Sequence, residues 1–298
     1  MALKNSAHGE SMRSQRFFAI GAVALIAGLW LQVPIAAQGV PLGLTSASGQ
    51  GVTPAYEGWY ANPDGTFTLS FGYFNRNTDQ VLEIPLGENN SIEPAEFDGM
   101  QPTRFEARRH WGVFGIVVPA DFGQHATVTW TIKMGSHEYS IPAALKTDWK
   151  IDALEGEGAN GNTPPRLSFV EGGPDGAAPL GIVGPALHGS VGEPVEVTVW
   201  SKDDAVAGAG LAAAFSGGRG RAPPRVTLTW FKHQGPGQVM FSQGTERVPA
   251  EGGMMTTTAT FDAPGEYILR VRANDSAVAT SGHSQCCWTN GFVKVTVR

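Results

Sequence analysis

Two adjacent cysteines near the C-terminus have the clearest chemical potential in the chain. The segment His283-Ser284-Gln285-Cys286-Cys287-Trp288 contains both cysteines of the sequence. Neighbouring Cα atoms lie ~3.8 Å apart, closer than the ~4.4–6.8 Å of ordinary disulfides, so a vicinal disulfide would be strained and easily reduced. The alternatives are a soft copper or zinc site with His283, which lacks the usual CxxC spacing, intermolecular disulfides, and reduced thiols. An oxidising compartment favours the vicinal disulfide.

Three carboxylates form a second candidate metal site. Asp203, Asp204 and Asp275 are hard oxygen ligands of the kind that calcium prefers. The alternative is that these acidic residues solvate loops and cap turns at strand ends. The cofactor prediction is therefore none, with calcium and copper or zinc as the alternatives.

The catalytic motifs of the common enzyme classes are incomplete. Residues 156–161 match GxGxxG, but they lie in a polar loop rather than between a strand and a helix. Residues 282–286 begin like GxSxG and lack its final glycine. Glu93, Glu96 and Asp98 form a glycosidase pair only if the fold brings two of them together. We expect a protein that is not an enzyme.

An aromatic cluster offers a different kind of site. Tyr56, Trp59 and Tyr60 lie close together in the sequence, and sugar rings often stack on such side chains. The commoner role for aromatic residues on an edge strand is packing beneath a neighbouring segment. Both interpretations stay open.

The elements that must position these residues are β-strands. Phe67, Leu69, Phe71 and Tyr73 alternate with small or polar residues, which is typical of a half-buried strand. Such strands bury one face and leave the other wet, as in antiparallel sandwiches. We predict an all-β chain with two antiparallel, immunoglobulin-like β-sandwich domains in tandem. The same alternation recurs at 126–134, 195–200, 226–230, 255–261, 269–273 and 293–297.

Four motifs in the C-terminal part support a more specific assignment. They are Gly192-Glu193-Pro194-Val195, Trp230 in mid-strand, Asp262-Ala263-Pro264-Gly265-Glu266-Tyr267, and Arg272-Ala273-Asn274-Asp275. On these residues, the region 166–298 resembles the immunoglobulin-like sandwiches of bacterial surface proteins, and PKD-type modules most of all.

The resemblance implies a role for each motif. It places Gly192–Val195 before strand B, Trp230 in the core on strand C, and Tyr267 at the tyrosine corner before strand F. The facing positions on strands B and F are Val197 and either Leu269 or Val271, so the antibody-type disulfide between the sheets is absent.

In this topology the B–C and F–G loops emerge at the same pole of the sandwich. The long insertion 205–224 and the loop 276–291 would therefore meet there, and binding often resides in loops on a rigid scaffold. We expect any binding site of this region at that pole. Its candidate residues are Asp203, Asp204, Asp275, His283, Cys286, Cys287 and Trp288.

The N-terminus has the layout of a secretory signal. Arg13 and Arg16 precede an apolar run over 17–31, and small residues follow around 34–38. The run is short for a membrane span of ~20 residues. We predict a Sec-type signal peptide and a secreted or periplasmic protein without a membrane span after cleavage. An uncleaved anchor is the alternative.

Composition limits the partners and suggests the domain organisation. The 298 residues include 39 Gly and 20 Pro, and the net charge is −6, with no basic stripe of the kind that nucleic-acid binding needs. Glycine and proline concentrate in 38–55, 152–190 and 205–224. The predicted organisation is a signal peptide (1–37), a flexible leader (38–55), domain one (56–150), a linker (151–165) and domain two (166–298).

These observations lead to three functional hypotheses. The first is a non-catalytic protein that acts in binding, adhesion or assembly at the cell envelope, with a protein or glycan partner. The second is a metal-binding or redox protein that uses His283, Cys286 and Cys287. The third is an extracellular carbohydrate-binding or accessory protein.

Overall fold

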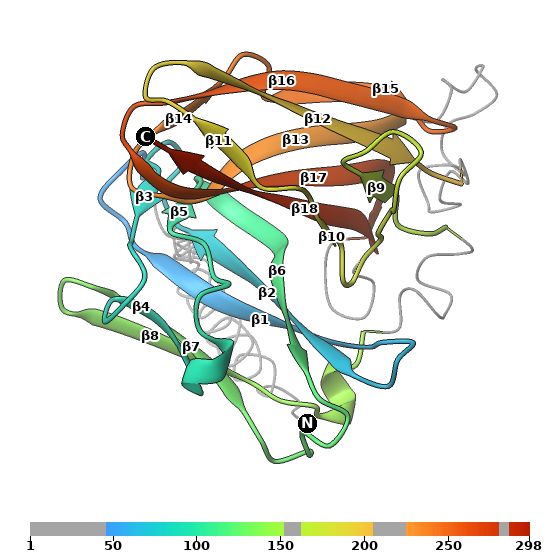
Figure 1. The fold of residues 1–298 in the computed structure, drawn as a ribbon. Coiled ribbons are helices and arrows are strands. Elements are labelled where there is room, and N and C mark those ends of the chain that lie inside the picture. Colours follow the sequence, from blue (N-terminus) through green and yellow to red (C-terminus); the bar gives the residue numbers. More distant parts are fainter. Residues whose placement is uncertain (1–45, 152–161, 205–224, 280–285) are drawn as a thin grey trace, which may run out of the picture. The chain divides into compact units, whose positions relative to one another are not determined.

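The computed structural model describes residues 46–151, 162–204, 225–279 and 286–298, all within one compact unit that spans 46–298. The predicted signal peptide, the insertion 205–224 and His283 lie outside the described residues. Within the described part, regular structure consists of strands and two short 3-10 turns, Ala95–Phe97 and Thr147–Trp149 (Figure 1). The prediction of an all-β chain with antiparallel sheets is confirmed.

Residues 52–143 form two three-stranded antiparallel sheets and a short two-stranded ladder. One sheet has the order β1 (Val52–Ala61), β2 (Phe67–Asn75), β6 (Arg108–Val118). The other has the order β4 (Asn90–Glu93), β7 (Val128–Met134), β8 (His137–Ala143), and β3 (Leu82–Glu83) pairs with β5 (Arg104–Phe105).

The core between these sheets is aromatic, and Trp130 lies at its centre. The indole ring packs edge-on against Phe71 and Phe114 and stacks on Phe105. The indole Nε1 donates a hydrogen bond of 2.9 Å to Oδ1 of the buried Asn90. A buried Trp needs such a partner because an unsatisfied N–H costs free energy in an apolar core.

The first strand starts earlier than the sequence suggested. β1 begins at Val52, inside the segment 38–55 that was expected to be a flexible leader, so that expectation is wrong for residues 52–55. Val52 is fully buried, and its strand pairs with β2 along its whole length. Burial of apolar surface outweighs the local turn-forming composition here.

Residues 166–297 form a second pair of sheets. One has the order β14 (Val239–Phe241), β16 (Gly253–Phe261), β12 (Pro194–Lys202), β9 (Arg166–Ser168). The other has the order β10 (Ile182–Val183), β18 (Cys286–Val297), β17 (Gly265–Ala279), β13 (Arg225–Gln234), β15 (Thr245–Pro249), and β11 (Leu187–Gly189) also pairs with β18.

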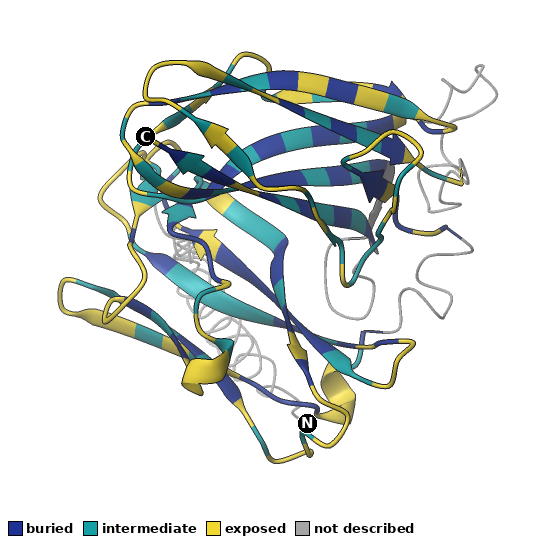
Figure 2. Cartoon of the chain, viewed as in Figure 1, coloured by how far each residue is buried: buried dark blue, intermediate teal, exposed yellow. Residues whose placement is uncertain are grey.

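This second strand order is immunoglobulin-like. β9, β12, β16 and β14 take the places of strands A, B, E and D, while β13, β17 and β18 take those of C, F and G. Buried and exposed residues alternate along β16 (Figure 2), as expected for a strand with one face in the core. Trp230 lies on β13 and is 4 % exposed, as the resemblance implied.

Tyr267 forms a tyrosine corner at the start of β17. Its hydroxyl donates to the carbonyl oxygen of Ala263 at 2.8 Å and accepts from the N–H of Gly237 at 3.0 Å. Gly237 lies in the loop that follows β13, and Ala263 lies in the loop that precedes β17. The Tyr267 hydroxyl therefore links these two loops. The geometry agrees with the tyrosine corner of immunoglobulin-like sandwiches.

Candidate functional site: the Trp200 groove and the edge of strand β12

Two of the predicted pole residues bind the segment that connects the two pairs of sheets. Oδ2 of Asp275 accepts a 2.6 Å hydrogen bond from Nδ2 of the buried Asn162. Oδ2 of Asp204 accepts from the backbone N–H and the hydroxyl of Thr163, at 3.1 and 2.7 Å. These carboxylates thus hold residues 162–163 against the end of the second sandwich.

The third predicted group at this pole also makes internal contacts. Cys287 is buried and disulfide-bonded, and its Sγ lies 3.8 Å from the carbonyl oxygen of Asn162. The Trp288 indole lies so close to Gly112 of β6 that a Cβ at that glycine would approach Nε1 to 2.1 Å. Trp288 therefore packs on the first pair of sheets.

The candidate calcium ligands do not assemble into a metal site. Across residues 46–151, 162–204, 225–279 and 286–298, no three His, Cys, Asp or Glu side chains group so that they could hold a metal ion. Asp203, Asp204 and Asp275 all lie in these ranges. The soft-metal candidate includes His283, which lies outside the described residues.

The aromatic cluster near the start of the chain packs internally. The Tyr56 hydroxyl donates to the Ala144 carbonyl and the Trp59 Nε1 donates to the Lys146 carbonyl, each at 2.8 Å. Tyr60 is 8 % exposed. Each of the three side chains therefore makes contacts within the fold, and Tyr56 and Trp59 stay partly exposed.

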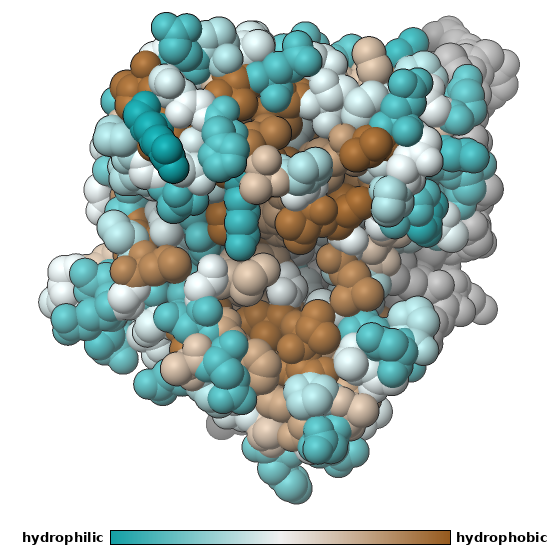
Figure 3. All heavy atoms as spheres, in the orientation of Figure 1, coloured by the Kyte–Doolittle hydropathy of each residue, from teal (hydrophilic) through white to brown (hydrophobic). Residues whose placement is uncertain are grey.

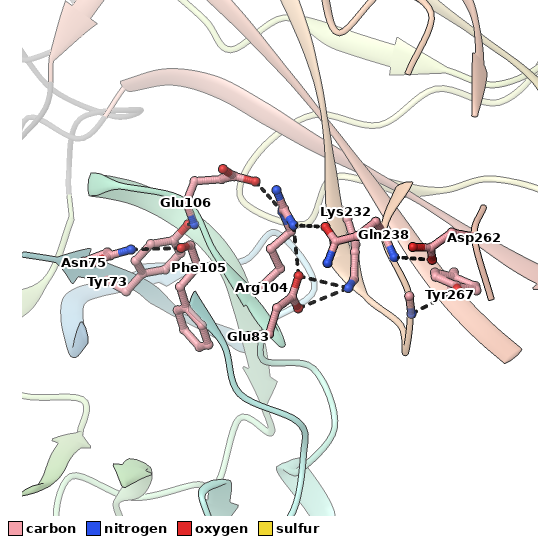
Figure 4. Close-up of polar contacts among 11 residues, drawn as sticks. Tyr73, Asn75, Glu83, Arg104, Phe105, Glu106, Lys232, Gln238, Asp262 and Tyr267 are labelled. Atoms are coloured by element: carbon pink, nitrogen blue, oxygen red, sulfur yellow. Dashed lines mark hydrogen bonds and ion pairs between the residues drawn. The ribbon is translucent and has the colours of Figure 1, made fainter. Parts of the chain in front are cut away.

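The outer face of β13, β17 and β18 is covered by the first pair of sheets, in a contact region that we call the junction. Lys232 Nζ lies 3.1 Å from both carboxylate oxygens of Glu83, and Arg104 joins Glu83, Glu106 and Gln238. Figure 4 shows this chain of polar contacts, which reaches the tyrosine corner through Asp262. Since the Lys232 side chain is only 2 % exposed, the ion pair is shielded from solvent on one side.

Backbone groups reinforce the junction. The N–H of Thr103 donates to the carbonyl of His233 at 2.9 Å, and Nδ2 of Asn290 donates to the carbonyl of Gly112 at 2.6 Å. The Gln234 side chain donates to two carbonyls of the 99–101 segment. Directional bonds of this kind fix the register of one surface against the other.

Buried cationic and imidazole groups lie at the centre of the junction. Burial, with Arg272 adjacent, lowers the pKa of Arg270 to about 9. Burial and the charge of Arg270 lower the pKa of His233 to about 3 and that of His110 to about 4. Both imidazoles are therefore neutral at neutral pH. A face that carries this many desolvated groups is not available to an external ligand.

The opposite sheet has an outer face that no other sheet of the described residues covers. Trp200 on β12 points away from the core between the buried Val199 and Ser201, and it is partly exposed. Its cross-strand neighbours are Met254 on β16 and Ser168 on β9. Met254 is 54 % exposed, so this sheet presents an aromatic ring and a flexible thioether side by side.

These residues line a pocket of about 380 Å³, which we call the Trp200 groove. A volume of ~300–1,000 Å³ is usual for ligand sites, which combine an apolar surface with a few polar groups. The groove lies at the end of the sheet where β12 leads into the insertion 205–224. Its lining side chains include Arg166, Ser168, Asp175, Trp200, Lys202 and Met254.

An ordered loop and an ion pair form one wall of the groove. The loop closes on β9 through two backbone bonds between Leu167 and Gly176, at 2.8 and 2.9 Å. Arg166 binds both carboxylate oxygens of Asp175, with Nε 2.9 Å from Oδ2. The hydrogen bonds from Arg166 lower the pKa of Asp175, so the wall keeps both charges at neutral pH.

Trp200 also borders a second, smaller pocket of about 100 Å³, which we call the edge slot. Its lining includes the apolar Phe169, Leu187 and Val293 and the outward-facing Glu196 and Thr198 of β12. Trp200 thus lines both the groove and the slot. In Figure 3, apolar side chains gather among polar ones on the face that carries β9, β10 and β11.

Sequence reasoning did not single out Trp200 as a site residue. The available signal was its position, since Val195, Val197 and Val199 alternate with Glu196, Thr198 and Trp200. A tryptophan on the polar face of an alternating strand directs a large apolar side chain away from the core. The arrangement is suited to reversible binding, through a ring face, a thioether and fixed charges.

No helix within the described residues is long and apolar enough to cross a membrane.

No family model and no curated protein matches the chain. A protein of unknown function from Porphyromonas gingivalis W83 aligns over 82 % of this chain and 99 % of its own, at 10 % identity and a TM-score of 0.24. The D0–D1 domain of intimin aligns over 82 % and 97 %, at 12 % identity and 0.23. The Yersinia pseudotuberculosis adhesin InvE aligns over 81 % and 58 %, at 11 % identity and 0.23. The immunoglobulin-like assignment of residues 166–297 therefore depends on their strand order.

Proposed function

We propose that this chain is a non-catalytic binding protein of the cell envelope, and that its ligand docks in the Trp200 groove. The observation that carries the proposal is the pair of the partly exposed Trp200 and the exposed Met254 beside the Arg166–Asp175 ion pair. The outer face of the other sheet is covered by the junction, which leaves this face for a partner.

The compartment and the finer family assignment belong to the same proposal. Residues 1–37 act as a Sec-type signal peptide, and the mature chain resides in the periplasm or outside the cell. Residues 56–150 and 166–298 act as two domains, of which the second is a PKD-type module. The tyrosine corner at Tyr267 and the buried Trp230 support the second assignment.

The experiment screens the full chain against two defined probe sets, a glycan array and a displayed library of random linear peptides. Binders are then measured against Trp200→Ala and against Trp149→Ala as the matched control. Trp149 is also a surface tryptophan, 47 % exposed, but it lies outside the groove.

We expect binding to fall at least about tenfold in Trp200→Ala, because an aromatic anchor at the centre of a contact often contributes more than ~1.4 kcal/mol. Trp149→Ala should bind like the unmodified chain. Probes that bind Trp200→Ala as tightly as the unmodified chain, or that lose affinity for Trp149→Ala, would contradict the proposal. The absence of any binder in both probe sets would contradict it as well.

The two cysteines have a structural role in this proposal. Cys287 is disulfide-bonded, and Cys286 is the only other cysteine in the sequence, which supports a vicinal disulfide in the mature protein. Mass spectrometry of the purified chain should find it two hydrogen atoms lighter than after reduction. A stoichiometric metal that is lost in Cys287→Ser would instead support a metal-binding protein.

A further inference from the structure

We infer that the open edge of β12 binds an extended peptide segment by strand addition, with one apolar side chain of the peptide in the edge slot. The inference rests on the proposed function, because the added strand would run beside Trp200 and the groove. It names the class of ligand, which the groove alone does not.

The first step is the unequal pairing of β12. On one side, β16 pairs with residues 194–201 of β12. On the other side, β9 pairs with residues 200–202 alone. Among the described residues, 194–199 therefore have a ladder partner on one side only, with Gly189 of β11 packed beside Val195. A strand edge of this kind is a template for a further strand.

The second step is the lining of the edge slot. Val197 faces the core, whereas Glu196 and Thr198 face outward, yet all three line the same pocket. One depression can touch both faces of a strand only where it runs along the strand's edge. Val293 belongs to the opposite sheet and forms the floor, so the slot opens between the two sheets.

The third step is the chemistry of the occupant. An extended peptide beside residues 196–199 would continue the row that β9 begins, and its side chains would point alternately inward and outward. The inward side chain would meet the apolar Phe169, Leu187 and Val293, and the slot's volume of about 100 Å³ admits one such side chain. The outward neighbour would lie against Trp200.

A glycan fits the edge less well than a peptide. A strand edge offers N–H and C=O groups at the repeat of another strand, and a peptide backbone matches that repeat residue by residue. The inner slot is apolar, and a sugar hydroxyl placed there would lose its hydrogen bonds to water. The open Trp200 groove accepts either class, so the edge slot decides between them.

The test uses the tightest linear peptide selected on the full chain from a displayed random library. Two versions of it are synthesised, in which alternate backbone nitrogens are methylated in one register or in the other. In an antiparallel or parallel ladder only every second residue directs its N–H toward the partner strand. We expect one version to bind at least about tenfold more weakly than the parent peptide, and the other to bind within about threefold of it. Only one of the two sets of methyl groups replaces N–H groups that face β12, so only that version loses hydrogen bonds and clashes with the strand.

A protein variant tests the same edge from the other side. Pro185 is exposed and lines the slot, so Pro185→Trp should cover the slot and weaken the peptide at least about tenfold. His188 is exposed on the neighbouring β11 and does not line the slot. His188→Trp is the control and should leave binding unchanged.

The outcomes separate the inference from the proposed function. Peptides that need Trp200 but show no difference between the two methylation registers, or no effect of Pro185→Trp, would overturn strand addition and leave the groove intact as a binding site. If only glycans bind, and their binding is weakened by Trp200→Ala, strand addition is likewise overturned while the groove stays a binding site. Loss of Trp200 dependence in every probe would overturn both.

Discussion

At the scale of single residues, several side chains that the sequence offers as binding residues make contacts within the fold instead. Asp204 and Asp275 accept hydrogen bonds from Thr163 and Asn162, and Trp288 packs on Gly112. A sequence shows the residue type but not the donor that a carboxylate meets. Trp200 is partly exposed, at a strand position that the alternation alone identifies as outward.

Gly112 should not tolerate a side chain. Its φ is +51°, and a Cβ would approach the Trp288 indole to 2.1 Å. Gly112→Ala should therefore lower the free energy of unfolding by about 2–4 kcal/mol, from backbone strain plus overpacking. Gly65 has a φ of +85° with nothing within 4 Å, so Gly65→Ala measures the backbone strain alone. Equal losses in urea denaturation of the two variants would show that Trp288 does not pack on Gly112.

The tyrosine corner makes a second residue-level prediction. Tyr267→Phe removes a hydroxyl that holds the Ala263 carbonyl and the Gly237 N–H. Unfolding free energy should fall by about 1–3 kcal/mol, because two backbone groups lose their partner. Tyr139→Phe, on the partly exposed edge strand β8, should stay within about 0.5 kcal/mol. A neutral Tyr267→Phe would mean that the corner does not stabilise the fold.

At the scale of elements, the strands were predictable and their partners were not. Alternation at 195–200 and 255–261 predicts β12 and β16 with the correct inward faces. The covered outer face of β13 instead packs Phe231 against His110, which lies far away in the sequence. Since local periodicity reports only whether a face is apolar, it could not show that the polar face of β13, β17 and β18 is buried in the junction.

The Lys232–Glu83 pair tests how the junction is stabilised. Glu83→Gln leaves the Lys232 ammonium buried without its carboxylate, and unfolding free energy should fall by about 1–3 kcal/mol. Lys232→Met in the same chain removes the unpaired charge and should recover part of that loss. Denaturation of both single variants and the double variant gives the coupling energy. A coupling near zero would show that the two side chains do not interact in solution.

At the scale of the whole molecule, the buried imidazoles predict a loss of stability in acid. The pKa values of His233 and His110 are lowered to about 3 and about 4, against ~6.5 in an unfolded chain. Between pH ~6.5 and about 4 the unfolded state therefore binds more protons, so unfolding free energy falls as the pH falls. Above pH ~6.5 this contribution is fully present.

Denaturation of the full chain at several pH values between 7.5 and 4.5 measures the effect. Each pKa unit corresponds to ~1.4 kcal/mol, so the two histidines together should cost a few kcal/mol over this range. The variant with His110→Gln and His233→Gln should show a shallower slope. Identical slopes in the two proteins would mean that the junction does not bury neutral imidazoles.

The central claim is that a ligand docks on Trp200, and a fluorine NMR titration tests it most directly. The full chain is labelled with fluorotryptophan at its 8 tryptophans, and the Trp200 and Trp149 signals are assigned by substitution to Phe. On titration with the tightest probe from the screens, we predict that the Trp200 signal shifts to saturation with the binding curve while the Trp149 signal stays in place. A saturating ligand that leaves the Trp200 signal unchanged would contradict the account.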